Sequence, residues 1–381
     1  MRMTGSSLYY ANSMTPPRAV LTILADDLTG ACDTGALFAA KHPVPVTVWP
    51  RTPVPAAARA VDTETRTVDG PTAAHRAAAA VAAAPAERIF KKIDSTLRGH
   101  VGPEVDALFG ATGATGVLLS PAFPARGRTV VERMLMIDGV PIMETAFRRD
   151  PELPRSDSGN VIDILRPVLD RPLAWIPLDQ VRAGLNALSA RLVRLRGTVA
   201  IADAETDADL AALVDAALAI EPSPLLVGSA GLARALAARL GLLIEHVPLP
   251  SVGRWLIVAG SRHPATRRQV ETARAAGLRV LTTSDRDNVD RRTVAAQLAA
   301  EARRALDQER FDLVAVTGGD TAIRLFEALG AERFDLVGPP APGLAFGWLR
   351  SPSHPDLAVL TKAGSFGAPD LFVSLRDEAL A

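Results

Sequence analysis

The stretch KKIDSTLRGHVGPE, residues 91–104, holds two lysines, an aspartate, two hydroxyl side chains, an arginine and two glycines. The residues just before it are apolar, and Ile93 continues an alternating, strand-like pattern into it. A strand that ends in charged and hydroxyl residues and is followed by glycines is typical of a sheet strand that opens into a ligand crevice. The alternative is a solvated turn in which Asp94 or Ser95 caps the next helix.

Several side chains of this stretch suit the chemistry of an anionic substrate. Asp94 could accept a proton from a hydroxyl group, while Lys91, Lys92 and Arg98 could hold a carboxylate or a phosphate. Because side chains alternate along a strand, Lys91 and Lys92 are expected to point to opposite faces. Only one of the two would then reach the crevice.

Length and composition limit the class of protein. A chain of 381 residues exceeds one ordinary core and predicts two domains, and 48% hydrophobic with 22% charged residues describes a globular protein. The 42 basic and 42 acidic residues balance, so no electrostatic feature favours nucleic acid or a membrane as a partner. The single cysteine, Cys32, rules out an internal disulfide, fits a reducing compartment and is expected to be buried.

The first residues show no sign of regular structure. Residues 1–18 lack a periodic pattern and the apolar core of a signal peptide, and no later run is long enough to span a bilayer. We therefore expect a disordered leader, a start at either Met1 or Met14, and a protein of the cytoplasm.

A second acidic strand end follows the leader. The run AVLTILA, residues 19–25, predicts a buried strand that ends at Asp26 and Asp27, and a glycine turn then leads to a helix expected over about residues 33–41. Adjacent acids are costly there unless they are solvated, paired or bound to something. One of them could simply cap the helix, but ligands of open α/β sheets bind at this edge, so we expect one to face the crevice beside Asp94.

The first domain, residues 19–247, alternates strand and helix patterns, which predicts a mostly parallel sheet flanked by helices. Further strands are expected at residues 44–49, 89–92 and 117–120, helices at residues 72–83, 101–109 and about 231–240, and a hairpin over residues 129–143 with its turn at Asp138-Gly139. Segments 157–165, 185–195, 199–202, 207–219 and 225–227 complete the domain. In the loop of residues 121–128, Arg126 and Arg128 flank Gly127, which would let the backbone approach a ligand, although a surface loop has the same pattern.

Prolines at positions 248 and 250, followed by Gly253, mark the linker to a second domain, residues 253–381. Its expected strands are residues 255–259, 280–283, 313–316 and 358–362. Its expected helices are residues 264–276, 291–306 and 322–329. The predicted fold class is therefore α/β with two domains, each a mostly parallel sheet flanked by helices, and a cleft between them.

Three strand-to-glycine turns of the second domain favour a nucleotide, although neither standard phosphate-binding fingerprint is present. They lie at residues 260–261, 318–319 and 364–365. Two of them open helices whose first N–H groups would suit phosphate oxygens. Asp320 would repel a phosphate unless a divalent cation intervened, which points to Mg²⁺.

These motifs form an ordered series along the chain. It comprises ILADDLTGACDTG (23–35), KKIDSTLRGHVGPE (91–104), PAFPARGRT (121–129), GVPIMET (139–145), VGSAGLARAL (227–236), TGGDTA (317–322) and KAGSFGAPDLF (362–372). The series resembles the motifs of the four-carbon acid sugar kinases over about residues 19–372. The resemblance implies a sugar-acid-binding N-terminal domain, an ATP-binding C-terminal domain, and phosphorylation of threonate, erythronate or 3-oxo-tetronate at the 4-hydroxyl.

The resemblance also implies roles for single residues. The implied sugar-acid contacts are Asp26, Asp27, Asp94, Arg98 and Arg128. The residue types of the stretch 91–104 add Lys92 and Ser95 as candidate substrate contacts, and Asp94, Asp26 and Asp27 are the candidate catalytic carboxylates. The implied ATP contacts are Ser261, Gly318, Gly319, Asp320, Thr321 and Gly364, and the charge of Asp320 suggests that it reaches ATP through Mg²⁺. The sequence departs from the family pattern at Cys32, at residues 260–263 and at residues 339–349, which leaves the identity of the substrate open.

The resulting hypothesis places Mg²⁺-ATP on the second domain and a short hydroxy acid on the first, with closure about residues 245–253. Arg98 would bind the carboxylate of the acid, and Asp94, ahead of Asp26 or Asp27, would accept the proton of the 4-hydroxyl. Two other interpretations stay open: a binding regulator without turnover, and a transferase for another small acid. The sequence does not choose among the four-carbon acids and their stereoisomers, and a homodimer is expected only as the commonest oligomer.

Overall fold

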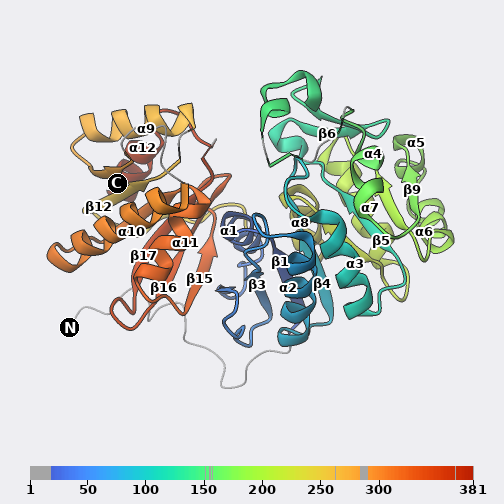
Figure 1. Cartoon of the computed structure of the whole chain (residues 1–381), viewed down its shortest axis with the longest axis horizontal. Helices are drawn as coiled ribbons and strands as arrows, with labels where there is room; N and C mark the ends of the chain where they lie inside the picture. Colours follow the sequence, from blue (N-terminus) through green and yellow to red (C-terminus); the bar gives the residue numbers. More distant parts are fainter. Residues whose placement is uncertain are drawn as a thin grey trace. The chain divides into compact units, whose positions relative to one another are not determined.

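The computed structural model describes residues 19–150, 152–153, 156, 158–261, 263–283, 291–364 and 366–380. The leader expected at residues 1–18 lies outside these residues. Backbone contacts divide the chain into an N-terminal unit, residues 19–34 and 48–243, and a C-terminal unit, residues 35–47 and 244–380. Both units are α/β, each with a mostly parallel sheet and helices on its faces, which confirms the predicted α/β class with two domains (Figure 1).

The sheet of the N-terminal unit is parallel throughout its described strands, in the order β3-β1-β4-β11-β5-β10-β9. The strands are β1 (Leu21–Ala25), β3 (Ala58–Asp62), β4 (Arg88–Lys92), β5 (Val117–Ser120), β9 (Leu173–Ile176), β10 (Val199–Ala202) and β11 (Leu225–Gly228). Helices cover both faces, so the inner strands read as continuous apolar runs such as LTILA rather than as alternating ones.

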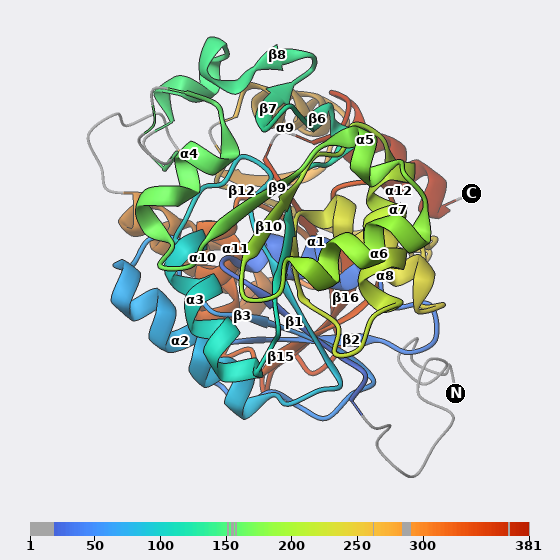
Figure 2. The same ribbon diagram turned by 90° about the vertical axis from the view of Figure 1, so that its right-hand side faces the viewer.

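The helices of this unit are α1 (Leu28–Ala36, whose last residues belong to the other unit), α2 (Gly70–Ala83), α3 (Val101–Thr112), α4 (Val161–Leu165), α5 (Leu178–Val181), α6 (Leu185–Arg194), α7 (Asp207–Leu218) and α8 (Ala230–Arg239). Helices α2 and α3 lie against one face of the sheet, and α6, α7 and α8 against the other (Figure 2).

A small antiparallel sheet of β6 (Arg128–Val131), β7 (Met134–Ile137) and β8 (Val140–Pro141) follows β5, and the predicted Asp138-Gly139 turn joins its last two strands. Single 3₁₀ turns are η2 (Pro124–Arg126), η3 (Ile142–Glu144), η4 (Ala146–Arg149) and η5 (Arg166–Val168).

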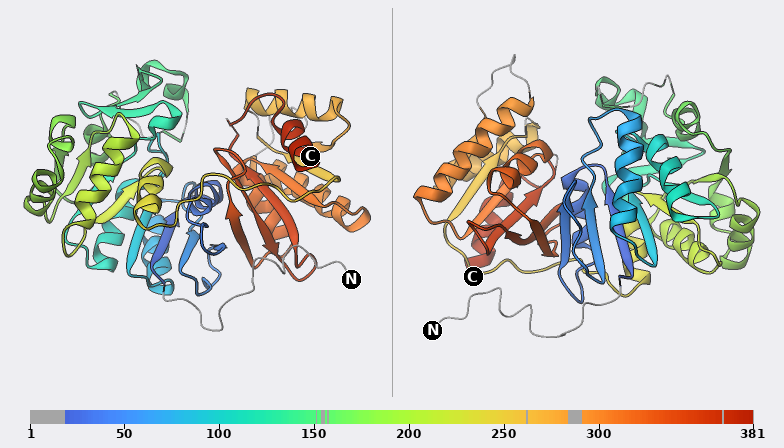
Figure 3. Two further views of the ribbon diagram at one scale, coloured as in Figure 1. Left: turned by 180° about the vertical axis from the view of Figure 1, so that it is seen from behind. Right: turned by 60° about the horizontal axis from the view of Figure 1, so that its bottom comes forward.

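The sheet of the C-terminal unit has the order β13-β12-β14-β17-β16-β15-β2. Its strands are β2 (Val44–Val48), β12 (Trp255–Ala259), β13 (Arg279–Thr282), β14 (Leu313–Thr317), β15 (Arg333–Gly338), β16 (Leu344–Arg350) and β17 (Leu357–Lys362), and its helices are α9 (Pro264–Ala275), α10 (Arg291–Gln308), α11 (Gly319–Ala328) and α12 (Leu371–Leu380). Strands β13, β12, β14 and β17 are parallel, and β16, β15 and β2 continue the sheet with antiparallel pairs. Helices α9 and α12 pack on one face and α10 and α11 on the other (Figure 3).

Three features differ from the expectations. Helix α1 begins at Leu28 and not near Asp33, because the Asp27 Oδ1 atom accepts the Gly30 N–H at 2.9 Å and caps the helix directly after β1. Strand β2, expected in the first domain, pairs with β15 of the C-terminal unit. Strands β3, β9, β15 and β16 and helix α12 were not predicted as elements at all.

Candidate functional site

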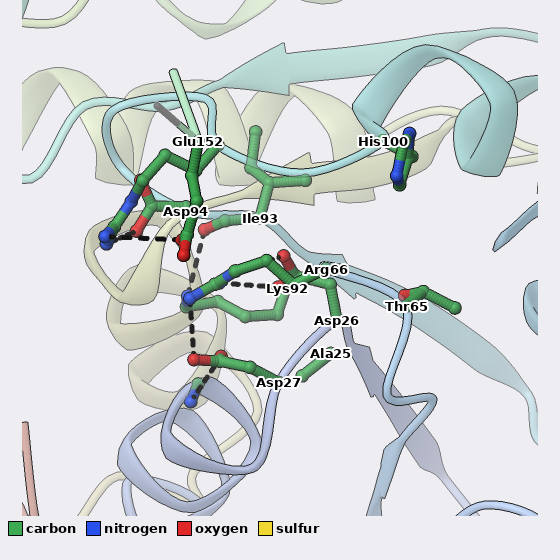
Figure 4. A network of polar contacts seen from close by, with 12 residues as sticks. Ala25, Asp26, Asp27, Thr65, Arg66, Lys92, Ile93, Asp94, His100 and Glu152 are labelled. Atoms are coloured by element: carbon green, nitrogen blue, oxygen red, sulfur yellow. Dashed lines mark hydrogen bonds and ion pairs between the residues drawn. The ribbon is translucent and has the colours of Figure 1, made fainter. Parts of the chain in front are cut away.

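The carboxyl ends of three neighbouring strands bring the predicted acidic residues together in the N-terminal unit. Strand β1 lies between β3 and β4, with Ala25 opposite Asp62 and Leu24 opposite Lys91. Because the strands are parallel, the residues that follow β1 and β4 emerge at the same edge. Figure 4 shows Asp26, Asp27 and Asp94 in one network of polar contacts there, as the sequence predicted.

Arg66 joins two of these aspartates and was missed by the sequence analysis. Its Nε and Nη2 atoms lie 2.8 and 2.9 Å from the two carboxylate oxygens of Asp26, and its Nη1 atom lies 2.6 Å from Asp27 Oδ2. Arg66 stands four residues after β3, so recognising that strand would have placed its following loop at this edge. The side chain of Asp27 is 20% exposed and that of Asp26 only 3%, so Asp27 is the more accessible acid.

Asp94 is held by residues of its own turn. Its Oδ2 atom accepts hydrogen bonds from Arg98 Nε at 3.0 Å and from the Thr96 N–H at 2.9 Å, and the Thr96 hydroxyl also donates to it. Arg98 Nη2 lies 2.7 Å from Asp94 Oδ1. Leu97 makes this tight turn possible with a φ of 65°, an uncommon value for a residue with a side chain. The N-cap position of helix α3 is held by His100, which makes no side-chain capping bond, so the alternative in which Asp94 or Ser95 caps the helix is wrong.

The guanidinium group of Arg98 is therefore already engaged by carboxylates of the protein. Two of its three guanidinium nitrogens contact Asp94, and the third, Nη1, lies 3.6 Å from Asp150 Oδ2 and 4.0 Å from Glu152 Oε2. The predicted contact of Arg98 with a substrate carboxylate would use Nη1 or an exchange of partners.

The charges of this cluster keep two of its acids ionised. Burial raises the pKa of Asp94, but the charge and hydrogen bonds of Arg98, the charge of Arg66 and a bond from Thr96 outweigh burial and hold that pKa well below its usual value. Burial likewise raises the pKa of Asp26, and the charges of Arg66, Lys91 and Lys92 together with bonds from Arg66 lower it beyond that effect.

The two lysines of β4 separate as predicted. Lys92 Nζ donates to the Ile93 carbonyl at 2.9 Å and lies in the cluster (Figure 4). Lys91 is fully buried, and its Nζ lies 2.9 Å from Glu104 Oε2 of α3. Glu104 Oε1 also accepts a 2.6 Å bond from the Thr65 hydroxyl, so Lys91 belongs to a buried network beneath the cluster.

Gly99 fits only because it lacks a side chain. A Cβ atom there would lie 2.8 Å from Asp26 Oδ2, and its φ is 87°. The glycine therefore lets the loop after β4 close over Asp26.

The other predicted sugar-acid contacts are less closely tied to the cluster. Arg128 Nη1 donates to the Arg126 carbonyl, and the guanidinium carbon lies 5.9 Å from the centre of the Phe147 ring. Ser95 is partly exposed on the turn that holds Asp94. Cys32 is buried, as predicted.

The C-terminal unit brings its three glycine turns to one sheet edge. Ala259, Thr317 and Lys362 end the neighbouring strands β12, β14 and β17 in register. A Cβ atom on Gly318 would lie 3.2 Å from the Ser261 N atom, and one on Gly364 would lie 2.3 Å from Ser261 Oγ. The three turns thus lie close together at this edge.

The two residues that follow Gly319 differ in their surroundings. Thr321 packs under the first turn, since a Cβ atom on Gly260 would lie 1.7 Å from its Oγ1 atom. Asp320 is exposed in the first turn of α11, where an acidic side chain faces the positive end of the helix.

Within the described residues, no group of three or more His, Cys, Asp or Glu side chains is arranged to hold a metal ion. Asp320 would thus supply a single carboxylate to Mg²⁺, which commonly uses one or two protein carboxylates together with substrate phosphates. No helix in the described part of the chain combines the length and apolar character that a bilayer crossing needs.

Comparison with known proteins agrees with this division into two kinds of site. A family model described as a sugar-binding N-terminal domain matches residues 21–236, and one described as a nucleotide-binding C-terminal domain matches residues 278–372. A D-threonate kinase of Salmonella typhimurium is 31% identical, with 91% of this chain and 95% of the relative covered. A 3-oxo-tetronate kinase of Pseudomonas fluorescens is 29% identical, with 94% and 97% covered.

Two solved structures are similar over most of the chain. A Salmonella typhimurium protein named as a candidate tRNA synthase superimposes with a TM-score of 0.80 over 94% of this chain and 99% of that one; at 22% identity the likeness shows the fold alone. A Bordetella bronchiseptica protein, 27% identical with a TM-score of 0.51 over 96% of this chain and 98% of that one, was solved as a domain-swapped dimer with bound citrate.

Fold and sites thus define a protein with a sugar-binding part followed by a nucleotide-binding part. The chain belongs to the four-carbon acid sugar kinase family.

Proposed function

We propose that the protein is an ATP-dependent kinase that transfers a phosphoryl group to the 4-hydroxyl of a four-carbon sugar acid. The observation that carries the proposal is the cluster of Asp26, Asp27 and Asp94 with Arg66 and Arg98, which lies at a strand edge inside the sugar-binding match. A hydroxy acid needs both elements of this cluster: cations for its carboxylate and carboxylates for its hydroxyl groups.

The substrate carboxylate is proposed to bind the cations of this edge. Arg98 contributes its Nη1 atom, whose carboxylate neighbours in the described part of the chain are the more distant Asp150 and Glu152. Lys92, Ser95 and Arg128 are the further proposed contacts, and the citrate bound by the Bordetella protein supports a site for small hydroxy acids.

The proposed acceptor of the hydroxyl proton is Asp94. Its lowered pKa keeps it ionised, so it is ready to accept a hydrogen bond without first losing a proton. Phosphoryl transfer passes through a loose transition state that needs little help from a strong base, so a weakly basic carboxylate that orients the hydroxyl and takes its proton late is sufficient. Asp27 is the second candidate because its side chain is the most exposed of the three acids.

ATP is proposed to bind the contacting turns of the C-terminal unit, through Ser261, Gly318, Gly319, Asp320, Thr321 and Gly364. The proximity of these turns and the nucleotide-binding match support the assignment. Mg²⁺ held by Asp320 would neutralise charge on the phosphates.

Substrate identity requires a panel, since the two relatives phosphorylate different acids by name. The purified protein is incubated with Mg²⁺-ATP and, separately, with D-threonate, D-erythronate, L-erythronate or 3-oxo-tetronate, and ADP release is followed by a coupled assay. We expect ADP release with at least one acid and a phosphorus NMR signal of a primary phosphate ester. Binding of acid and ATP without ADP release would support the regulator, and release only with other acids would support the alternative transferase.

A homodimer in the cytoplasm is proposed as the working state. The dimer of the Bordetella protein supports the assembly. Light scattering on the purified protein would show a mass near 80 kDa for a dimer, twice the 40.1 kDa of the chain.

A further inference from the structure

The loop that follows β17, residues 363–368, is held from below by two buried side chains. Its residue Ser365 lies outside the described residues. Lys362 is 2% exposed, and its Nζ atom donates to the carbonyl oxygens of Ala363, Gly364 and Phe366 at 2.9, 3.2 and 2.9 Å. All three N–H bonds of its ammonium group are therefore used on backbone carbonyls.

Gln269 of α9 holds the same loop from a second element. It is 1% exposed, and its Nε2 atom lies 2.8, 3.0 and 3.0 Å from the carbonyl oxygens of Phe366, Gly367 and Ala368. The Thr266 hydroxyl adds a 2.8 Å bond to the carbonyl of Gly364. Each described carbonyl oxygen from residue 363 to residue 368 thus lies within 3.2 Å of a donor atom of Lys362, Gln269 or Thr266.

This arrangement fixes the direction of the N–H groups. Across a trans peptide bond, the carbonyl of one residue and the N–H of the next point in opposite directions. The N–H groups of Gly364, Gly367 and Ala368 follow carbonyls that point at Lys362 or Gln269, so they point away from both. None of these three N–H groups donates a hydrogen bond to the described part of the chain.

Successive N–H groups that point outward, here those of Gly367 and Ala368, can form an anion-binding concavity, and the Gly364 N–H belongs to the same loop. The loop also lies beside the first glycine turn, because a Cβ atom on Gly364 would lie 2.3 Å from Ser261 Oγ and 3.6 Å from the His263 Cβ atom. A lysine at a nucleotide site usually contacts phosphate itself as a point charge. Lys362 is already engaged by carbonyls, which indicates a different role.

We propose that Lys362 and Gln269 are positioning residues for the nucleotide. They turn the carbonyl groups of the loop inward and thereby present its N–H groups to the phosphate oxygens. The inference rests on the proposed ATP site and adds the residues that shape it.

The first test compares two variants that hold the same loop from different elements. Binding of ATP and of inorganic tripolyphosphate to the full-length protein is measured by calorimetry for Lys362→Met, Gln269→Leu and the double variant. Lys41→Met and Gln308→Leu, which change exposed residues, serve as matched controls. We expect each single variant to weaken both ligands by about tenfold or more, and the double variant to lose little beyond the larger single loss, because both side chains order one loop.

The outcomes separate the inference from the proposed function. Normal binding by a folded Gln269→Leu protein, with binding lost in Lys362→Met, would make Lys362 a direct phosphate ligand and overturn the positioning role. A wild-type protein that binds neither ATP nor tripolyphosphate would overturn the proposed nucleotide site and this inference with it.

A second test needs no variant and therefore holds if the substitutions prevent folding. Amide hydrogen exchange of the wild-type protein is measured with and without ATP. We expect exchange at Gly364, Gly367 and Ala368 to slow when ATP is bound. Saturating ATP that leaves exchange at all three unchanged would show that these N–H groups do not face the nucleotide.

Discussion

Arg98 binds Asp94 through two parallel contacts, Nε to Oδ2 at 3.0 Å and Nη2 to Oδ1 at 2.7 Å. A bidentate arginine–carboxylate pair fixes both distance and plane, so each residue orients the other. The pair explains why Asp94 stays ionised. It also means that Arg98 would have to bind the substrate carboxylate while two of its nitrogens contact Asp94.

Replacing Asp94 with asparagine tests its proposed role. The amide keeps the shape and an acceptor oxygen but cannot take the proton, so we expect kcat to fall ~10²–10⁴-fold with a much smaller change in the KM for the sugar acid. Asp27→Asn, measured in parallel, is expected to affect kcat less. The reverse order of effects would move the acceptor to Asp27.

The pair of Arg66 and Asp26 predicts a large effect on stability. Arg66→Met leaves the nearly buried Asp26 carboxylate without its main partner, which we expect to cost roughly 3–5 kcal/mol of unfolding free energy at pH 7. Because the pKa of Asp26 is lowered in the folded protein, its stabilising contribution is present above its unfolded pKa and is lost as pH falls through the folded value. Urea unfolding from pH 7 downward should therefore show an acid-dependent loss in the wild type that is missing in Arg66→Met.

Two comparisons make the Arg66 result specific. Arg51→Met changes an exposed arginine of the same unit and is expected to unfold like the wild type. Adding Asp26→Asn to Arg66→Met removes the unpaired charge and should restore much of the lost stability. No recovery in the double variant would mean that Arg66 acts through packing and not through Asp26.

Gly99→Ala is expected to harm the site more than an ordinary glycine substitution. Its new Cβ atom would meet Asp26 Oδ2 at 2.8 Å, whereas Gly113, with a φ of 64° at the end of α3, has open space around it. Gly113→Ala should cost only the roughly 1–2 kcal/mol of a left-handed backbone. Equal thermal unfolding and equal kcat/KM for the two variants would contradict a close contact between Gly99 and Asp26.

The lowered pKa of Lys362 predicts that the free energy of unfolding changes with pH in the alkaline range. Burial lowers its pKa from 10.5 to about 8 in the folded protein, so between these values the unfolded chain binds more protons than the folded one. Under linkage, this group then makes the free energy of unfolding rise with pH from about 8 to about 10.5. Measured by urea unfolding at pH 7 to 10, the difference between wild type and Lys362→Met should shift in favour of the wild type as pH rises. A constant difference would mean that Lys362 titrates normally.

The meeting of Asp26, Asp27 and Asp94 could be predicted because it follows from one rule, the shared edge of parallel strands. The position of Arg66 could not be predicted, because it depends on recognising β3. This strand has the sequence ARAVD, and Arg59 inside it breaks the apolar run. The fold accommodates this arginine through bonds from Arg59 to the Thr22 hydroxyl at 3.0 Å and to the Pro85 carbonyl at 2.5 Å. These partners are distant in sequence, so a local pattern does not show them.

Charged residues inside strands also explain why the antiparallel half of the C-terminal sheet was not predicted. Strand β15 carries Asp335 in its interior, and this carboxylate pairs with Arg333 and with Arg350 of the neighbouring β16, each at 2.9 Å. Cross-strand ion pairs let charged residues occupy a strand, and they become visible only when the register is known. The ion pair of Arg98 with Asp94 could not be predicted either, since it depends on the left-handed turn at Leu97.

The position of β2 has a consequence for synthesis of the protein. Its ladder partner, β15, is encoded roughly 300 residues later, so at about 5–20 residues per second a ribosome needs roughly 15–60 s to deliver it. During that time the apolar strand VPVTV has been made but its β15 side lacks a partner, and an unpaired strand edge is a template for wrong pairing. We therefore expect a fragment that ends between the two strands to aggregate more readily than the whole chain.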